Sequence, residues 1–294
     1  MTAGPDVIHL NAAGAAASIA LRGAEPVSWR VGDRELLWSG DPAHWAYHAP
    51  LLFPVVGASA GGEVRVDGAA YPMPQHGFAR TSNFALIDRG EDRARLRLVD
   101  DERTRAHYPF AFALEVIVRL EPAALELSFV VANTGDRPLP YGIGVHPAFP
   151  WPLDGPDRGR HRVRFERPER AEVPEVAAGG LLARKSRPVP LDGNVLPLAP
   201  ELFKEALVFL DAESRRLAFE APTNAAITLE TEGFGHLAVW TKPTAPFLSL
   251  EAWTGHADWE DFGGELTERA STLLLAPGAT GRHAVRMVWR EPER

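Results

Sequence analysis

Hydrophobic and polar residues alternate with a period of two along several stretches of the chain. Every second residue is apolar across residues 112–120 and 125–131, and Ala94, Leu96 and Leu98 alternate with arginines. Successive side chains of a β-strand point to opposite faces of a sheet, so this pattern predicts strands with one buried face and one face that is wetted or lines a groove.

Turn residues separate these stretches, for example Asp67-Gly68 and Pro277-Gly278. Helical periodicity is poor, and its best candidates, residues 200–206 and 257–262, allow one or two turns each. Strand after strand without intervening helices predicts an all-β fold, an antiparallel β-sandwich or barrel, rather than an α/β sheet. No internal repeat or low-complexity linker interrupts the chain, so we predict a single domain over residues 1–294.

Composition and charge remove several classes of function. The formal net charge of −8 argues against nucleic acid or an anionic membrane as the main partner, since both attract basic surfaces. The absence of cysteine excludes disulfides, thiolate nucleophiles and cysteine-ligated metals. The N-terminal residues have no basic segment followed by an unbroken apolar one, and no stretch approaches the ~18 apolar residues of a membrane span. We therefore expect a cytoplasmic protein.

The first candidate stretch for chemistry is residues 74–80, which contain His76, Gly77 and Arg80. A glycine after a histidine in a turn lets the backbone approach a ligand closely, and an arginine offers a fork of donors. The alternative is an ordinary loop histidine near the surface.

The second stretch is residues 141–149. If it forms a strand, Gly142, Gly144 and His146 share one face, and the two glycines leave room for a flat ligand beside the histidine. A proline at position 147 ends the ladder and places His146 at the strand end. The alternative is a bulge with a capped histidine.

The third stretch, residues 247–256, places a carboxylate among aromatic side chains. Phe247, Ser249, Glu251 and Trp253 share one face of the expected strand. Aromatic neighbours desolvate a carboxylate and raise its pKa toward the range useful for a general base, and they also stack on sugar rings. The alternative is a solvated glutamate on a strand.

Taken in order, the three stretches resemble the motifs of the aldose 1-epimerase (galactose mutarotase-like) family. The chain has His-Gly-Phe-Ala-Arg from His76, Gly-Val-His-Pro-Ala-Phe from Gly144 and Glu-Ala-Trp from Glu251. The resemblance extends over about residues 21–277. It implies a two-layer β-sandwich with a sugar cleft on a concave face, and an isomerase that interconverts the α and β anomers of an aldose without metal or nucleotide cofactor.

The resemblance also implies roles for individual residues. His146 matches the general acid, Glu251 the general base and His76 a second histidine that hydrogen-bonds the sugar near its ring oxygen. An acid must be protonated and a base ionised when the cycle starts, so we expect a charged His146 and a charged Glu251. We further expect Arg80, Trp253 and Phe149 to contact the sugar.

Two departures from the family motifs bear on the substrate. Ala58 follows Gly57 where many relatives carry an arginine that grips sugar hydroxyls, and the last motif has alanine in place of proline. The acidic residue that contacts sugar hydroxyls in relatives corresponds to Glu205 or Asp211.

Three other functions are compatible with the same residues. The protein could bind a sugar without turning it over, or act on a hexose 6-phosphate held by cations at the cleft rim. His76, His146 and Glu251 are also the ligand types of a non-haem iron site with two histidines and a carboxylate. The sequence leaves open whether the protein is a monomer or a homodimer.

Overall fold

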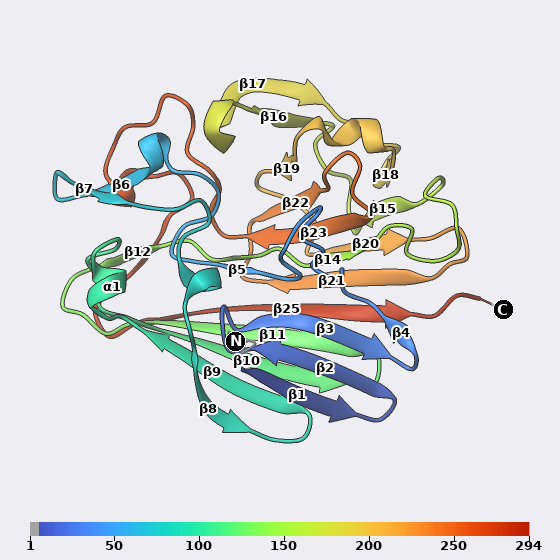
Figure 1. Ribbon diagram of the computed structural model, residues 1–294. Coiled ribbons are helices and arrows are strands. Elements are labelled where there is room, and N and C mark those ends of the chain that lie inside the picture. The colour runs from blue at the N-terminus through green and yellow to red at the C-terminus, as the bar shows by residue number, and fades with distance from the viewer. Residues whose placement is uncertain (1–5, 294) are drawn as a thin grey trace.

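The computed structural model describes residues 6–293, in which antiparallel strands dominate (Figure 1). The described residues contain one α-helix, α1 (Glu102–Arg105). Five short 3-10 turns accompany it: η1 (Ala60–Gly62), η2 (Ala79–Thr81), η3 (Ala178–Gly180), η4 (Pro200–Lys204) and η5 (Leu266–Glu268). This architecture confirms the predicted all-β fold built from large antiparallel sheets. No helix among residues 6–293 is long and apolar enough to span a membrane.

The largest sheet has nine strands, and its alternating sequence pattern matches its two faces. In spatial order the strands are β18 (Val195–Pro197), β15 (Arg162–Phe165), β20 (Arg216–Glu220), β21 (Ala226–Glu232), β25 (Thr280–Arg290), β11 (Ala124–Asn133), β10 (Phe112–Glu121), β9 (Arg93–Val99) and β8 (Ala85–Arg89). On β9 Ala94, Leu96 and Leu98 are buried and every arginine is exposed, as predicted. The buried face of this sheet forms one wall of the core.

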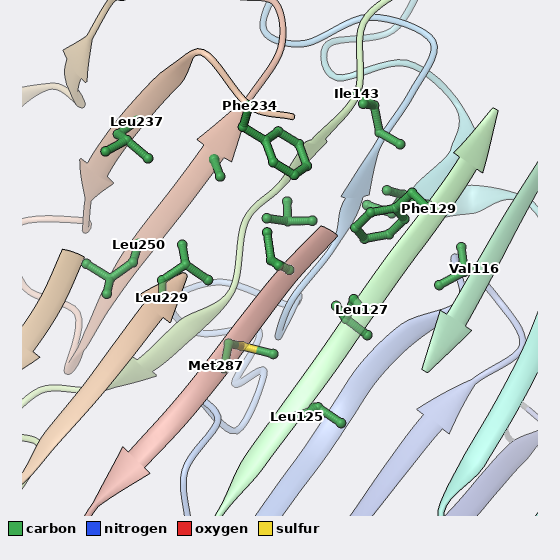
Figure 2. Packing of buried hydrophobic residues seen from close by; sticks show 14 of the residues in the cluster. Val116, Leu125, Leu127, Phe129, Ile143, Leu229, Phe234, Leu237, Leu250 and Met287 are labelled. Carbon is green, nitrogen blue, oxygen red and sulfur yellow. The ribbon is translucent and has the colours of Figure 1, made fainter. Parts of the chain in front are cut away.

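Two further sheets contribute to the opposite side of the core. A four-stranded sheet consists of β1 (Val7–Ala12), β2 (Ala15–Ala20), β3 (Glu25–Val31) and β4 (Arg34–Glu35). A six-stranded sheet consists of β19 (Leu207–Phe209), β22 (His236–Trp240), β23 (Phe247–Trp253), β13 (Gly144–Val145) and β5 (Leu51–Leu52), with β14 (Ala148–Pro150) also paired to β23. The first packs on β9 and β10 of the large sheet. Figure 2 shows Leu237 and Leu250 of the second in one cluster with Leu229 and Met287.

Three two-stranded ribbons complete the described strands. They are β12 (Leu139–Tyr141) with β24 (Leu273–Leu275), β16 (Glu172–Val176) with β17 (Leu182–Pro188), and β6 (Glu63–Val66) with β7 (Ala69–Pro72). The β16–β17 hairpin lies beside the six-stranded sheet at the top of Figure 1. The main apolar core draws buried side chains from Ile8 to Trp289, so segments near both ends of the described chain contribute to it.

Two of the local predictions differ from the structure. Residues 200–204 form the 3-10 turn η4, whereas residues 257–262 are not helical. Residues 141–146 are not one strand, because β12 ends at Tyr141 and β13 begins at Gly144. The backbone N–H of Gly142 instead donates to the carbonyl of Pro54 at 2.6 Å, which ties this break to the segment after β5.

Candidate active site

A pocket of about 430 Å³ lies on the face of the six-stranded sheet that points away from the main core. Strands β19, β22 and β23 supply Val208, Trp240, Glu251 and Trp253, and the β16–β17 hairpin supplies Val176, Gly180 and Leu182. The other lining residues come from connecting segments and are Trp45, Gly57, Gln75, His76, Arg80, His146, Lys204, Glu205, Ala206, Lys242 and Ala257. All three predicted catalytic side chains therefore line one pocket.

Glu251 is held on β23, whose seven residues are all buried. Leu248, Leu250 and Ala252 point into the core, so the alternating partners at 249, 251 and 253 face the pocket side, as predicted. Glu251 is 1% exposed, which excludes a solvated glutamate. Burial raises the pKa of Glu251 well above its usual range, although the Trp253 indole N–H donates to Oε2 at 3.1 Å and opposes part of that rise.

His146 follows β13 directly and meets the carboxylate. Its Nε2 lies 3.2 Å from Oε2 of Glu251, within reach of a single shared proton. Burial, with a smaller contribution from the nearby Arg80 guanidinium, lowers the pKa of His146 to about 3. The rings of Trp45 and Trp240 pack on the imidazole with centroids 4.8 and 5.2 Å away, so the surroundings that desolvate it are aromatic.

The two pKa shifts run against the charge states expected at the start of the cycle. We expected a charged His146 and a charged Glu251, but in the unliganded pocket burial favours the neutral form of each. The physical reason is desolvation, which penalises any charge that water cannot reach. Two protonation states of this pair hold the same number of protons. In one, His146 is neutral and the Glu251 carboxyl is protonated. In the other, that proton has moved from Glu251 to His146 and the two residues form an ion pair.

His76 has a defined hydrogen-bonding role. The backbone N–H of Gly57 donates to Nδ1 of His76 at 3.0 Å, and the N–H of His76 donates back to the carbonyl of Gly57 at 2.8 Å. An acceptor Nδ1 carries no proton, so the neutral ring keeps its proton on Nε2 and offers one donor. Burial, with His146 and Arg80 nearby, lowers the pKa of His76 well below its usual value, which favours this neutral donor form.

The glycines beside these histidines serve packing of the protein rather than the approach of a ligand. A Cβ on Gly77 would lie 2.2 Å from the carbonyl oxygen of Phe53, and a Cβ on Gly144 would lie 2.8 Å from the Trp253 ring. The space left by Gly144 is thus filled by Trp253. Neither Gly142 nor Gly144 lines the pocket, so the predicted flat-ligand surface on that face is wrong.

The three predicted sugar contacts divide into two that line the pocket and one that does not. Arg80 lies on η2, donates to the carbonyl of Gln75 at 2.8 Å and has its guanidinium 5.1 Å from the centre of the Tyr47 ring. Trp253 lines the pocket next to Glu251. Phe149 is fully buried in the main core and does not line the pocket, because its position on β14 turns it toward Leu248 on the core side of β23. Its assignment as a sugar contact is therefore wrong.

The structure separates the two acidic candidates. Glu205 lines the pocket, and its Oε2 accepts the N–H of Val176 at 2.9 Å. The side chain of Asp211 is 76% exposed and lies outside the pocket lining. Ala58 is outside the lining as well, and a Cβ on Gly180 would lie 3.6 Å from the Ala58 side chain, so the hairpin tip occupies the space above position 58.

Sequence reasoning missed several pocket residues. Trp45 and Trp240 form an aromatic wall with ring centroids 5.5 Å apart. Lys204 and Lys242 line the same pocket, although the whole chain has only three lysines, and the third, Lys185, lies on β17. A count of lysine against arginine would have marked these positions as unusual in a chain whose basic residues are nearly all arginine.

The arrangement of these side chains gives little support to an iron site with two histidines and one carboxylate. Among residues 6–293 no three histidine, aspartate or glutamate side chains gather as a group that could hold a metal ion. His76 uses Nδ1 to accept the Gly57 N–H, and His146 directs Nε2 at Glu251.

Comparison with known proteins gives a consistent result. The aldose 1-epimerase family model matches residues 6–286. The chain is 28% identical over 266 residues to the chromosomal protein LacX of Lactococcus lactis, with 84% of this chain and 87% of that protein covered. A galactose mutarotase-like protein from Lactobacillus casei is 26% identical with a TM-score of 0.90, covering 97% of this chain and 100% of the other. A galactose mutarotase related enzyme from Lactobacillus acidophilus is 26% identical with a TM-score of 0.89, covering 98% of each chain.

Proposed function

Since the chain belongs to the aldose 1-epimerase family, we propose that it interconverts the α and β anomers of an aldose by opening and closing the sugar ring. The observation that carries this proposal is the 3.2 Å contact between Nε2 of His146 and Oε2 of Glu251 inside a pocket that desolvates both. Anomer exchange needs one group that takes a proton and one that gives a proton. A buried acid–base pair that holds a single proton supplies both.

The protons balance over the cycle. In ring opening, the ionised Glu251 takes the proton of the C1 hydroxyl while the protonated His146 gives its proton to the ring oxygen, and the bond between C1 and that oxygen breaks. Glu251 is then protonated and His146 neutral, which is the other arrangement of the same single proton. After rotation about the bond to C1, the carboxyl returns its proton through the reverse steps and the ring closes as the other anomer.

The neutral resting pair is thus the arrangement from which ring closure starts. Ring opening starts from the ion pair, whose charges the sugar hydroxyls can stabilise in place of water. The neutral His76 would donate from Nε2 to a sugar oxygen, and Trp45, Trp240 and Trp253 offer apolar faces to the C–H surfaces of the ring. Two proton transfers that each contribute ~10²–10⁴-fold give the order of acceleration needed for a reaction that already proceeds slowly in water.

The decisive experiment is NMR exchange spectroscopy between the α and β anomers over a panel of free aldoses. We expect exchange well above the buffer rate for at least one sugar, and loss of that excess in the Glu251→Gln variant. Saturable sugar binding without any excess exchange would instead support a sugar-binding protein on the same fold. Activity that depends on added iron, manganese or zinc and disappears with a chelator would support the metal alternative.

One observation favours a phosphorylated aldose as a second candidate substrate. Lys204, Lys242 and Arg80 line the pocket, and none of the three lies within salt-bridge distance of a carboxylate among residues 6–293. Lysine binds phosphate as a compact charge with rotatable donors. Lys242 donates to the carbonyl of His44, which leaves its positive charge without a matching negative charge.

Parallel measurements of kcat/KM for free aldohexoses and their 6-phosphates decide between the two candidates. A phosphate site predicts a preference for the 6-phosphates that weakens with added salt and falls in the Lys204→Met and Lys242→Met variants. Equal or better activity on the free sugars would reject it. Lys185→Met is the matched control, because Lys185 is paired with Glu175 at 2.7 Å and lies outside the pocket lining.

A further inference from the structure

Ser249 is a buried polar residue whose hydroxyl the proposed reaction does not itself use. It lies on β23 two residues before Glu251 and is fully buried. A buried hydroxyl needs hydrogen-bond partners, and Ser249 Oγ has two, the carbonyl of Pro147 and Nδ1 of His146, each at 2.8 Å.

These two contacts determine where the protons lie. A hydroxyl has one proton to donate, and a carbonyl oxygen can only accept. If Ser249 donated to His146, its oxygen lone pairs would face those of the Pro147 carbonyl at 2.8 Å without a proton between them. Ser249 therefore donates to Pro147, and Nδ1 of His146 carries a proton that it donates to Ser249 Oγ.

The tautomer that follows suits proton transfer at Nε2. With its proton on Nδ1, a neutral His146 has its free lone pair on Nε2, which lies 3.2 Å from Oε2 of Glu251. In the other tautomer Nε2 would already carry the only ring proton, and giving that proton away would leave an imidazolate anion in a buried site. Trp45 and Trp240 pack on the ring, but neither makes a hydrogen bond to Nδ1 among the described residues.

We propose that Ser249 is a positioning residue that holds His146 in the Nδ1-protonated tautomer, so that the proton shared with Glu251 moves on Nε2. The proposal rests on the proposed epimerase function, because only a reaction at Nε2 makes the tautomer matter. It adds a third residue to the pair: Ser249 orients His146, and His146 exchanges a proton with Glu251.

The direct test is the ¹⁵N NMR signature of His146 in the whole protein. We expect the pattern of an Nδ1-protonated neutral ring in the wild type and a mixture of tautomers in Ser249→Ala. A wild-type His146 protonated on Nε2 would overturn the proposal. This measurement needs no substrate, so it distinguishes failure of the Ser249 proposal from failure of the epimerase proposal, which absence of anomer exchange in the wild type would indicate.

Kinetics supply the second test. For Ser249→Ala we expect kcat to fall roughly 10- to 100-fold. This is more than the loss of one hydrogen bond would cause and less than complete loss of the correct tautomer would cause. We expect KM to change less than about twofold. Ser249→Thr keeps the hydroxyl and should recover most of kcat. If Ser249→Ala fails to fold, the Thr variant and the wild-type NMR signature still decide.

Ser214 is a matched control for the loss of a buried serine. It is also fully buried and its hydroxyl also bonds to backbone, donating to the carbonyl of Arg167, but it lies outside the pocket lining. We expect Ser214→Ala to lower thermal stability and leave kcat unchanged. An equal loss of kcat in Ser214→Ala, or an unchanged kcat in Ser249→Ala, would show that Ser249 acts only through packing.

Discussion

The outer faces of the two largest sheets differ in how exposed their titratable side chains are. On the nine-stranded sheet, Arg95 pairs with Glu115 at 2.7 Å, and Arg286 pairs with Glu121 at 2.7 Å and with Glu230 at 3.4 Å. The arginines of these pairs are at least one-third exposed. On the pocket face of the six-stranded sheet, Glu251 and the neighbouring His146 are buried beside tryptophans.

The difference shows what a covering layer does to the same strand pattern. Both sheets alternate residues between a core face and an outer face, but water reaches one outer face and screens its charges. On the other, connecting segments and the β16–β17 hairpin cover the sheet, and burial shifts the pKa values of His146 and Glu251 toward the neutral form of each side chain. The segments packed over the sheet face, rather than the alternation of residues along the strand, therefore distinguish the candidate catalytic pair from a surface ion pair.

Replacing Glu251 by glutamine should have the largest effect. Glutamine keeps the shape of the side chain but has no basic oxygen, so we expect turnover to fall ~10²–10⁴-fold with little change in sugar affinity. Anomer exchange by NMR measures the first and titration with sugar the second. Glu121→Gln on the solvent face is the control and should exchange anomers at the wild-type rate. A Glu251→Gln variant within a few-fold of wild type would move the base elsewhere.

His146→Asn should lower turnover by ~10²-fold or more, because the amide donates a hydrogen bond but has no proton to transfer. Sugar binding should be largely kept. Polarimetry of anomer exchange at saturating sugar measures the change. If this variant retains wild-type turnover, the acid role passes first to His76, and His76→Asn becomes the variant to measure.

The pH dependence should reveal the shared proton. The pair gains a second proton only when His146 is protonated, near its lowered pKa of about 3, and loses its proton only above the raised pKa of Glu251. We therefore expect kcat/KM to be flat above the pKa of His146 until the pH approaches the raised pKa of Glu251, and then to fall by up to tenfold per pH unit. An acid limb near the ordinary pKa of a glutamate, ~4.3, or of a histidine, ~6.5, would mean that the residues titrate independently.

Trp240→Ala should act on binding more than on chemistry. The ring lines the pocket and lies edge-on to His146, so its loss removes an apolar surface for the sugar. An aromatic contact of ~0.5–1.5 kcal/mol corresponds to a KM increase of about 2- to 13-fold. Steady-state kinetics give the split between KM and kcat. A fall confined to kcat would show that the ring serves His146 rather than the sugar.

Arg286→Gln should have the smallest effect, and it tests the exposed ion pairs on the nine-stranded sheet. The pairs that it removes are solvent-screened, so we expect a loss of ~0.5 kcal/mol in the free energy of unfolding. Anomer exchange should not change. Urea denaturation checks the first expectation, and a loss above ~2 kcal/mol would mean that this face is less screened than its exposure indicates.

The sequence predicted the strands and the three pocket motifs because each depends on a local pattern. Alternation placed Glu251 and Ser249 on one face, and the aromatic neighbours indicated a raised pKa. The lowered pKa of His146 could not be predicted, since its burial depends on Trp45 and Trp240, which are distant in sequence. The same limit explains the errors at Phe149 and Gly144, whose surroundings come from β23. The assignment of the whole chain to one domain stays a prediction.

The distribution of lysine has a practical consequence for chemical labelling. Apart from the α-amino group, the only primary amines of this protein belong to Lys185, Lys204 and Lys242, all of them exposed. Two of these side chains line the pocket and the third is on the hairpin that forms part of its wall. An amine-reactive dye or resin would therefore attach mostly around the pocket entrance. Fluorophores placed this way would report sugar binding, whereas immobilisation through amines would obstruct it.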